Sequence, residues 1–181
     1  MPAGQANLQM MSGRGWFFFG GLILGPLIAV IIVGIGFWSW RATSVPPSWE
    51  TILATRSLHA AVAREAKNLK APISASEETL RAGMKIYRSN CGGCHGDFGQ
   101  PSKWGANGFY PRVPQFPQVP PALRSEEMFL IVQGGIRYSG MGSWKDLMSE
   151  EETWKVVLFL NNMQSLPPAV KLEWEAGKKN E

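Results

Sequence analysis

The run from Cys91 to His95 reads CGGCH, a C-x-x-C-H motif typical of covalent attachment of c-type haem. Two thiols at this spacing lie one helical turn apart, so each can add to a haem vinyl group, and the adjacent imidazole can bind the iron. Cys91 and Cys94 are the only cysteines among the 181 residues, so two thioethers would leave no thiol for a disulfide. We therefore predict one haem c, covalently bound through two thioethers, with His95 as an iron ligand.

Two other uses of a cysteine pair fit the sequence less well. A thioredoxin-like redox pair requires alternating strand and helix patterns, which the sequence lacks. A tetrahedral zinc site needs four ligands, whereas the chain offers these cysteines with only His59 and His95, and His95 adjoins Cys94 directly. His59 is more simply explained as a solvated residue than as a second axial ligand of the haem.

An apolar run without a charged residue extends from Gly15 to Trp40. As a helix of about 25 residues it would exceed the ~30 Å hydrocarbon core of a bilayer, and tryptophans lie at both of its ends. A cleaved signal peptide has an apolar core of only about 7–15 residues. We therefore expect an uncleaved transmembrane signal anchor over 15–41, preceded by a short cytoplasmic N-terminus over 1–14.

The orientation of this expected anchor follows from the haem motif, because Arg14 and Arg41 flank the run on both sides and give no charge bias. Haem c is attached on the outer face of the energy-conserving membrane. We therefore expect a single-pass protein of the inner (cytoplasmic) membrane, with its C-terminal haem domain on the periplasmic side.

The rest of the chain divides into a linker with a connecting helix over 42–70, a haem domain over 71–170 and a polar C-terminal tail over 171–181. The S-x-x-E run at 74–77 has the form of a capping box, and Leu80, Met84 and Tyr87 form one apolar stripe that leads into the haem motif. Further helices are predicted from Ser125 and after a second S-x-x-E run at 149–152. Residues 99–121 are rich in Gly and Pro and predict a loop that covers the haem.

The pattern Gly83-x-x-x-Tyr87-x-x-x-Cys91-x-x-Cys94-His95-Gly96 resembles the N-terminal helix of class I cytochromes c. The resemblance implies an all-α class I cytochrome c domain wrapped round one haem, here preceded by a single N-terminal transmembrane helix and a connecting helix. It also implies that the glycine lets the C-terminal helix cross, and that a backbone carbonyl within 110–114 accepts the Nδ1 proton of His95. Arg112, in that loop, would pair with a haem propionate or point to water.

Residues 135–144 resemble the distal ligand loop of this family, in which a methionine between small residues donates its thioether sulfur to the iron. Met141 is the candidate, because it lies outside helix periodicity and between glycines. Met148 is the weaker alternative, and Met84, Met128 and Met163 are expected in the core. The family often has proline after this methionine, whereas this chain has Gly142.

Ligation by His95 and Met141 would fill both axial positions and leave no open site for a substrate. We therefore predict no catalytic residue and an electron-transfer protein rather than an enzyme: a membrane-tethered monohaem cytochrome that carries single electrons between a respiratory or photosynthetic donor and acceptor. One alternative is a fixed subunit of a multisubunit membrane oxidoreductase complex, and another is a ligand-binding or peroxidatic haem protein. The expected partners are the lipid bilayer and redox proteins or other subunits, with no nucleic acid and no small-molecule substrate.

Overall fold

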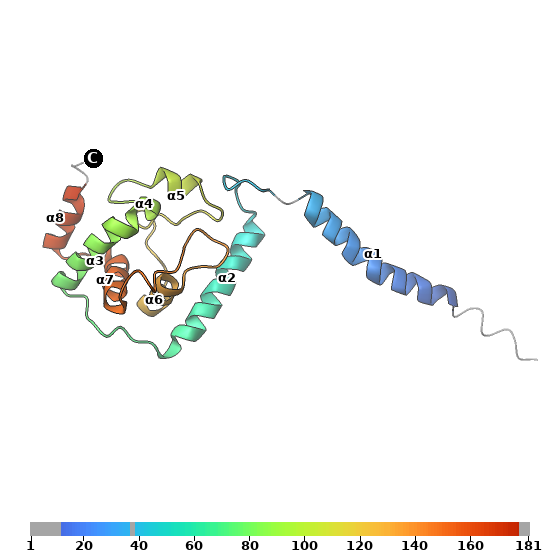
Figure 1. Cartoon of the computed structure of the whole chain (residues 1–181), viewed down its shortest axis with the longest axis horizontal. Coiled ribbons are helices and arrows are strands. Elements are labelled where there is room, and N and C mark those ends of the chain that lie inside the picture. The colour runs from blue at the N-terminus through green and yellow to red at the C-terminus, as the bar shows by residue number, and fades with distance from the viewer. Residues whose placement is uncertain (1–11, 37–38, 178–181) are drawn as a thin grey trace, which may run out of the picture. The chain divides into compact units, whose positions relative to one another are not determined.

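The computed structural model describes residues 12–36 and 39–177. The chain divides into two compact units, Met1–Trp40 and Arg41–Glu181. Among the described residues there are helices and no β-strand, and one isolated bridge pairs Asp97 with Gln100 (Figure 1). This helical character agrees with the all-α prediction.

The described part of the first unit is helix α1, Ser12–Gly36, which contains Pro26. None of the helices in the described residues combines the length and the hydropathy that crossing a bilayer requires. The prediction of a transmembrane anchor over 15–41, and of a single-pass inner-membrane location with it, is therefore wrong. The helix ends at Gly36, residues 39–41 are not helical, and Arg41 already belongs to the second unit. Most of the predicted N-terminal segment 1–14 lies outside the described residues.

The second unit carries the haem motif and the remaining helices. In chain order these are α2 Ser48–Glu65, the 3₁₀ turn η1 Ala66–Asn68, α3 Glu77–Asn90, α4 Gly92–His95, α5 Lys103–Asn107, α6 Ser125–Gly134, α7 Glu150–Asn162 and α8 Pro168–Ala176. Two of them were not expected from the sequence. The short α5 lies within the Gly- and Pro-rich loop, and α8 lies mostly in the stretch that was expected to be a polar tail.

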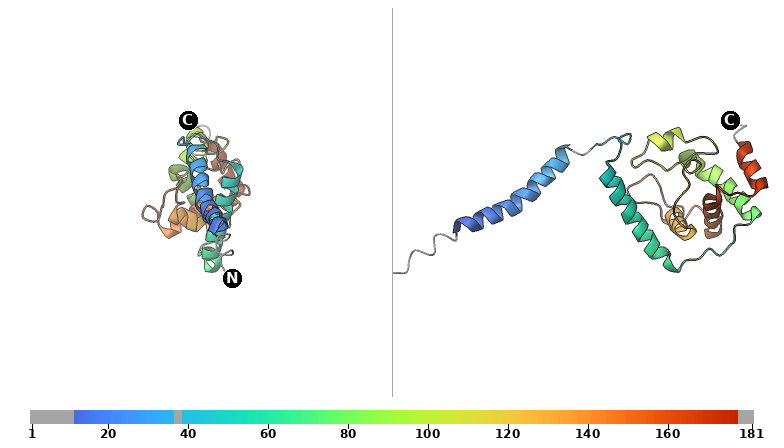
Figure 2. Two further views of the ribbon diagram at one scale, coloured as in Figure 1. Left: turned by 90° about the vertical axis from the view of Figure 1, so that its right-hand side faces the viewer. Right: turned by 180° about the vertical axis from the view of Figure 1, so that it is seen from behind.

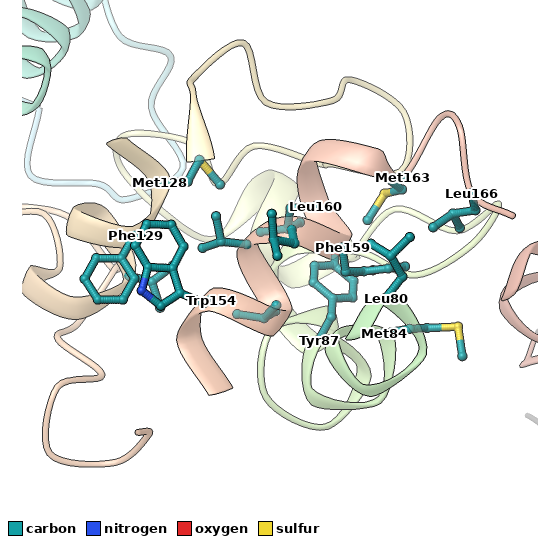
Figure 3. Packing of buried hydrophobic residues seen from close by; sticks show 14 of the residues in the cluster. Leu80, Met84, Tyr87, Met128, Phe129, Trp154, Phe159, Leu160, Met163 and Leu166 are labelled. Atoms are coloured by element: carbon teal, nitrogen blue, oxygen red, sulfur yellow. The ribbon is translucent and has the colours of Figure 1, made fainter. Parts of the chain in front are cut away.

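The core of this unit is centred on the crossing of α3 and α7. At the crossing, Gly83 lies so close to the backbone of Lys155 that a Cβ atom at position 83 would overlap with it. One turn further along α3, the fully buried Tyr87 packs on Phe159 with 5.6 Å between ring centroids (Figure 3). The expectation that glycine allows a close helix crossing here is confirmed.

Hydrogen-bonded caps fix where α3 and α7 begin. Ser149 accepts a hydrogen bond from the backbone N–H of Glu152, whose carboxylate accepts one in return from the Ser149 backbone, so the predicted capping box is confirmed. Helix α3 differs from the prediction, because its N-cap is Ser76 rather than Ser74. The Ser76 hydroxyl accepts from the backbone N–H of Thr79, and α3 begins one residue after it.

Helix α8 extends the domain into residues that the sequence pattern assigned to a polar tail. Its Trp174 is only 3% exposed and packs edge-on against Tyr87 and Phe159. Arg88 of α3 lies over the same indole, 4.5 Å from the ring centroid, and donates to the backbone carbonyls of Glu173 and Trp174. The helix is thus held by one buried aromatic side chain and by an arginine that bonds its last carbonyls. Residues 178–181 lie outside the described part.

The predicted connecting helix is α2, and the segment around it packs on the haem domain. In Figures 1 and 2, α2 runs along the side of the unit away from α8, and both α2 and η1 contact α6. No residue of α2 itself is buried, but Ala66 in the following turn is 1% exposed. Beyond it, Leu69, Ala71 and Ile73 pack against the core.

Candidate haem site

The two cysteines lie on a single turn of helix that directly follows α3. Cys91 is the C-cap of α3, where its backbone N–H bonds to the carbonyl of Tyr87 at 2.8 Å. Its own carbonyl accepts from the N–H groups of Cys94 and His95, at 3.1 and 2.9 Å, which closes the short helix α4. The thiols are free and half-buried. The geometry that the motif predicted, two thiols one helical turn apart and an imidazole beside them, is present.

Tyr87 and Gly96 hold the end of this turn in place. The Tyr87 hydroxyl donates a hydrogen bond of 2.7 Å to the carbonyl of Gly96, and burial raises the pKa of Tyr87, so the hydroxyl stays protonated. Gly96 itself has a φ of 83°, which side-chain-bearing residues rarely adopt. The chain therefore turns away from α4 immediately after His95.

The imidazole of His95 is fixed on two sides. Its Nδ1 lies 2.9 Å from the carbonyl oxygen of Pro114, and its ring stacks on Phe116 with 4.4 Å between centroids and a 6° angle between planes. Burial lowers the pKa of His95, and the bond to Pro114 opposes this shift only in part, so the ring favours the neutral form. A neutral ring that donates its Nδ1 proton to Pro114 presents the Nε2 lone pair as a ligand. The expectation that a carbonyl within 110–114 meets His95 is confirmed.

Gln115 ties the proline-bearing loop to the haem motif, a role that the sequence did not suggest. Its amide nitrogen donates to the carbonyls of Cys94 and Val113, at 3.1 and 2.9 Å, and its amide oxygen accepts from the N–H of Ser102 at 2.7 Å. The only sequence signal was its position next to Pro114. Gly105 of α5 supports the same region, because its backbone lies too close to the Cys94 carbonyl for any Cβ atom.

Arg112 makes a set of backbone contacts that the sequence did not suggest. Its guanidinium donates to backbone carbonyls, those of Asn107 and Phe109 within its own loop and those of Ala42 and Thr43 at the start of the second unit. The distances run from 2.6 to 3.0 Å. Arg112 is therefore a structural donor that organises the loop next to His95.

Met141 lies in a loop that backbone and hydroxyl groups tie together. The carbonyl of Met141 accepts from the N–H of Ile136 at 2.9 Å, and its N–H donates to the Ser139 hydroxyl at 3.1 Å. Gly135 begins the loop with a φ of 68°, and a Cβ atom there would contact the backbone of Gly142 at 2.7 Å. The Met141 side chain is half-buried against the core.

The other methionines of the second unit belong to the core, as expected for Met84, Met128 and Met163. Met148, the weaker ligand candidate, is also buried in the core, at 7% exposed. His59 is exposed on α2. Of the methionines in the second unit, Met141 is thus the one that is only half-buried.

The loop that supports His95 and the loop that carries Met141 meet at Phe109 and Gly140. A Cβ atom at position 140 would overlap with the Phe109 ring, which also packs edge-on against Trp104 at 4.6 Å between centroids. The structure therefore brings Cys91, Cys94 and His95 onto one turn, and it joins their supporting loop to the loop of Met141 through this contact.

The residues present fit a covalently bound haem. Two free thiols stand one turn apart, the neighbouring imidazole has its Nδ1 already engaged, and a thioether lies in a constrained loop. Among the described residues, no group of three or more His, Cys, Asp or Glu side chains is placed to hold a metal ion.

Residues 78–160 match the family model described as cytochrome c oxidase, cbb3-type, subunit III. The match supports a c-type cytochrome. It begins in the first turn of α3 and ends within α7, so the matched region contains the haem motif, the proline-bearing loop and the loop of Met141. Such domains imply covalently bound haem c and electron transfer. No curated protein and no solved structure shows significant similarity to the chain.

Proposed function

We propose that this protein is a monohaem cytochrome c that passes single electrons between a donor and an acceptor protein. Cys91 and Cys94 would hold the haem through thioethers, and His95 and Met141 would be its axial ligands. The observation that carries the proposal is the bond between His95 Nδ1 and the Pro114 carbonyl, because it prepares Nε2 to bind iron. When bound, haem c supplies a one-electron couple, whose potential is raised by methionine ligation.

The residues of this chain would hold the two iron ligands in fixed positions and keep other small ligands from the iron. Phe116 and Pro114 fix the plane of the His95 ring, and the loop bonds around Met141 restrict where its sulfur can lie. As an iron ligand, the Met141 thioether would deny that position to oxygen and other small ligands. Holding both ligands in place by packing and hydrogen bonds suits electron exchange without bond chemistry.

The test is a spectroelectrochemical titration of the purified holoprotein, followed by exposure of its reduced form to carbon monoxide. We expect one single-electron transition and no change of the reduced spectrum with carbon monoxide. Ready binding of carbon monoxide would contradict the proposal and favour a ligand-binding or peroxidatic haem protein.

A second role keeps the same haem chemistry but fixes the chain in a larger assembly. The family model is described as a subunit of an oxidase, which favours a fixed electron-transfer subunit of a multisubunit oxidoreductase. Gentle extraction from the native cells followed by sizing separates the two roles. A lone species near the chain mass of 20.0 kDa would contradict the subunit role, and co-migration with other chains would support it.

A further inference from the structure

The segment that opens the second unit is bonded to the loop that supports His95. The carbonyls of Ala42 and Thr43 accept from Arg112 at 3.0 and 2.6 Å, across about seventy residues of sequence. A second bond lies nearby, where the Tyr110 hydroxyl donates to the carboxylate of Glu50 at 2.7 Å. We call residues 42–50 the strap. The strap is bonded to the loop that supports His95 at two residues, Tyr110 and Arg112.

Arg112 connects the strap to the inside of the loop. One of its terminal nitrogens, Nη1, lies within hydrogen-bond distance of the carbonyls of Asn107, Phe109 and Ala42, while Nη2 reaches Thr43. A planar guanidinium holds such a set of acceptors in a fixed relative geometry, which an ammonium group cannot reproduce. Arg112 thereby sets the distance between the strap and the start of the loop.

The carbonyl that meets His95 belongs to Pro114, only two residues beyond Arg112. Between them, the N–H of Val113 bonds to the carbonyl of Gly105 at 3.3 Å. The same short stretch is therefore held from the strap on one side and from α5 on the other. Because only Val113 separates Arg112 from Pro114, a change in the bonds of Arg112 should shift the Pro114 carbonyl.

We propose that Arg112 is a positioning residue for His95. Through its bonds to the strap, Arg112 holds the Pro114 carbonyl against the Nδ1 atom of His95. The inference rests on the proposed function, because it assigns His95 to the haem iron. A shorter, better-aligned bond at Nδ1 makes the imidazole a stronger donor to the iron and stabilises the oxidised form. Weakening the support should therefore raise the reduction potential. The segment that opens the second unit would then be a part of the haem site.

The test uses the full-length holoprotein carrying Arg112→Lys, with Arg56→Lys as the matched control. Lysine keeps the positive charge but lacks the planar set of N–H donors, so a change in the variant cannot be assigned to charge. Arg56 suits the control because it is an exposed arginine on α2. The direct readout is the exchange of the His95 Nδ1 proton with deuterated water in the reduced protein, followed by NMR. The second readout is the reduction potential.

For Arg112→Lys we expect exchange about tenfold faster than in the parent, which corresponds to about 1.4 kcal/mol, and a shift of the potential to more positive values. Arg56→Lys should change neither. Exchange and potential equal to the parent in Arg112→Lys would overturn the inference. If that variant does not accumulate as holoprotein, Tyr110→Phe, which removes one bond to the strap, is measured in the same way and has the same opposing outcomes. A different result would contradict the proposed function, namely the absence of methionine ligation in the parent protein.

Discussion

Gly83 of α3 lies directly against the backbone of Lys155 on α7. A Cβ atom at position 83 would overlap with the Lys155 carbonyl and come within 2.9 Å of the Phe159 Cβ. Backbone on both sides of this contact leaves no flexible side chain that could move away. The crossing of α3 and α7, and with it the direction in which α3 delivers Cys91, depends on a residue without a side chain.

Gly83→Ala should lower the free energy of unfolding by about 1–3 kcal/mol, the usual cost of overpacking, although alanine is the better helix former. The matched control is Gly134→Ala in the last turn of α6, where an added Cβ atom meets nothing within 4 Å. That variant should be neutral or slightly more stable. Denaturant unfolding of both holoproteins checks the prediction, which equal effects of the two substitutions would contradict.

The cap of α3 gives a second prediction, in which two neighbouring serines should behave differently. Ser76→Ala removes the acceptor for the Thr79 N–H and should cost about 0.5–2 kcal/mol of stability. Ser74→Ala should change stability by less than about 0.5 kcal/mol, because its side chain is exposed and the cap lies elsewhere. Thermal unfolding compares them. A larger loss for Ser74→Ala would mean that α3 begins earlier than described.

Trp174 should be the main anchor of α8. Trp174→Ala removes a buried indole that packs on Tyr87, Phe159 and Arg88, with an expected loss of about 3–5 kcal/mol. Leu172→Ala, on the same helix at 67% exposed, should cost less than about 0.5 kcal/mol. Unfolding curves measure both. A nearly neutral Trp174→Ala would show that α8 does not support the domain.

Glu127 predicts how one part of the stability depends on pH. Its carboxylate accepts from the backbone N–H of Arg124 at 3.0 Å and pairs with the Arg124 side chain at 2.9 Å, and these contacts, the backbone bond first, lower its pKa below the usual range. Because the pKa of Glu127 is lower in the folded than in the unfolded protein, its contribution to the free energy of unfolding is complete above the ordinary glutamate pKa. The contribution is lost as the pH falls through the pKa of the folded protein. Glu127→Gln should therefore cost about 1–3 kcal/mol at neutral pH, and less on acidification.

Denaturant unfolding of the parent and Glu127→Gln over a series of pH values from neutral to acid checks this sign. Glu126→Gln on the same turn is the control, since no hydrogen bond of its side chain to the cap is described. A difference between parent and Glu127→Gln that grows as the pH falls would contradict the assignment.

The sequence was sufficient for those features that depend on neighbouring residues. The stripe of Leu80, Met84 and Tyr87 and the S-x-x-E box at Ser149 each encode their own helix, and the spacing of Cys91 and Cys94 encodes the turn between them. The glycine at position 83 could be interpreted because the resemblance supplied the helix that crosses it. Met141 could be separated from Met84, Met128 and Met163 by its lack of helical periodicity, which is a local property of the sequence.

What the sequence did not reveal depends on partners far away in the chain. Trp174 is buried only because α3 and α7 bring Tyr87 and Phe159 together, so the tail that contains it appeared polar. Arg112 finds its acceptors at Ala42 and Thr43, which no local pattern indicates. The predicted transmembrane helix was wrong for a different reason: an uncharged run gives no signal for where a helix ends within it.

The central claim is that His95 and Met141 are the axial ligands of one haem, and near-infrared absorption of the oxidised holoprotein tests it most directly. Sulfur-to-iron ligation by methionine gives an absorption band in this region. We predict that the band is present in the parent and in Met148→Leu, and that it disappears in Met141→Leu. Absence of the band from the parent, or its survival in Met141→Leu, would contradict the account.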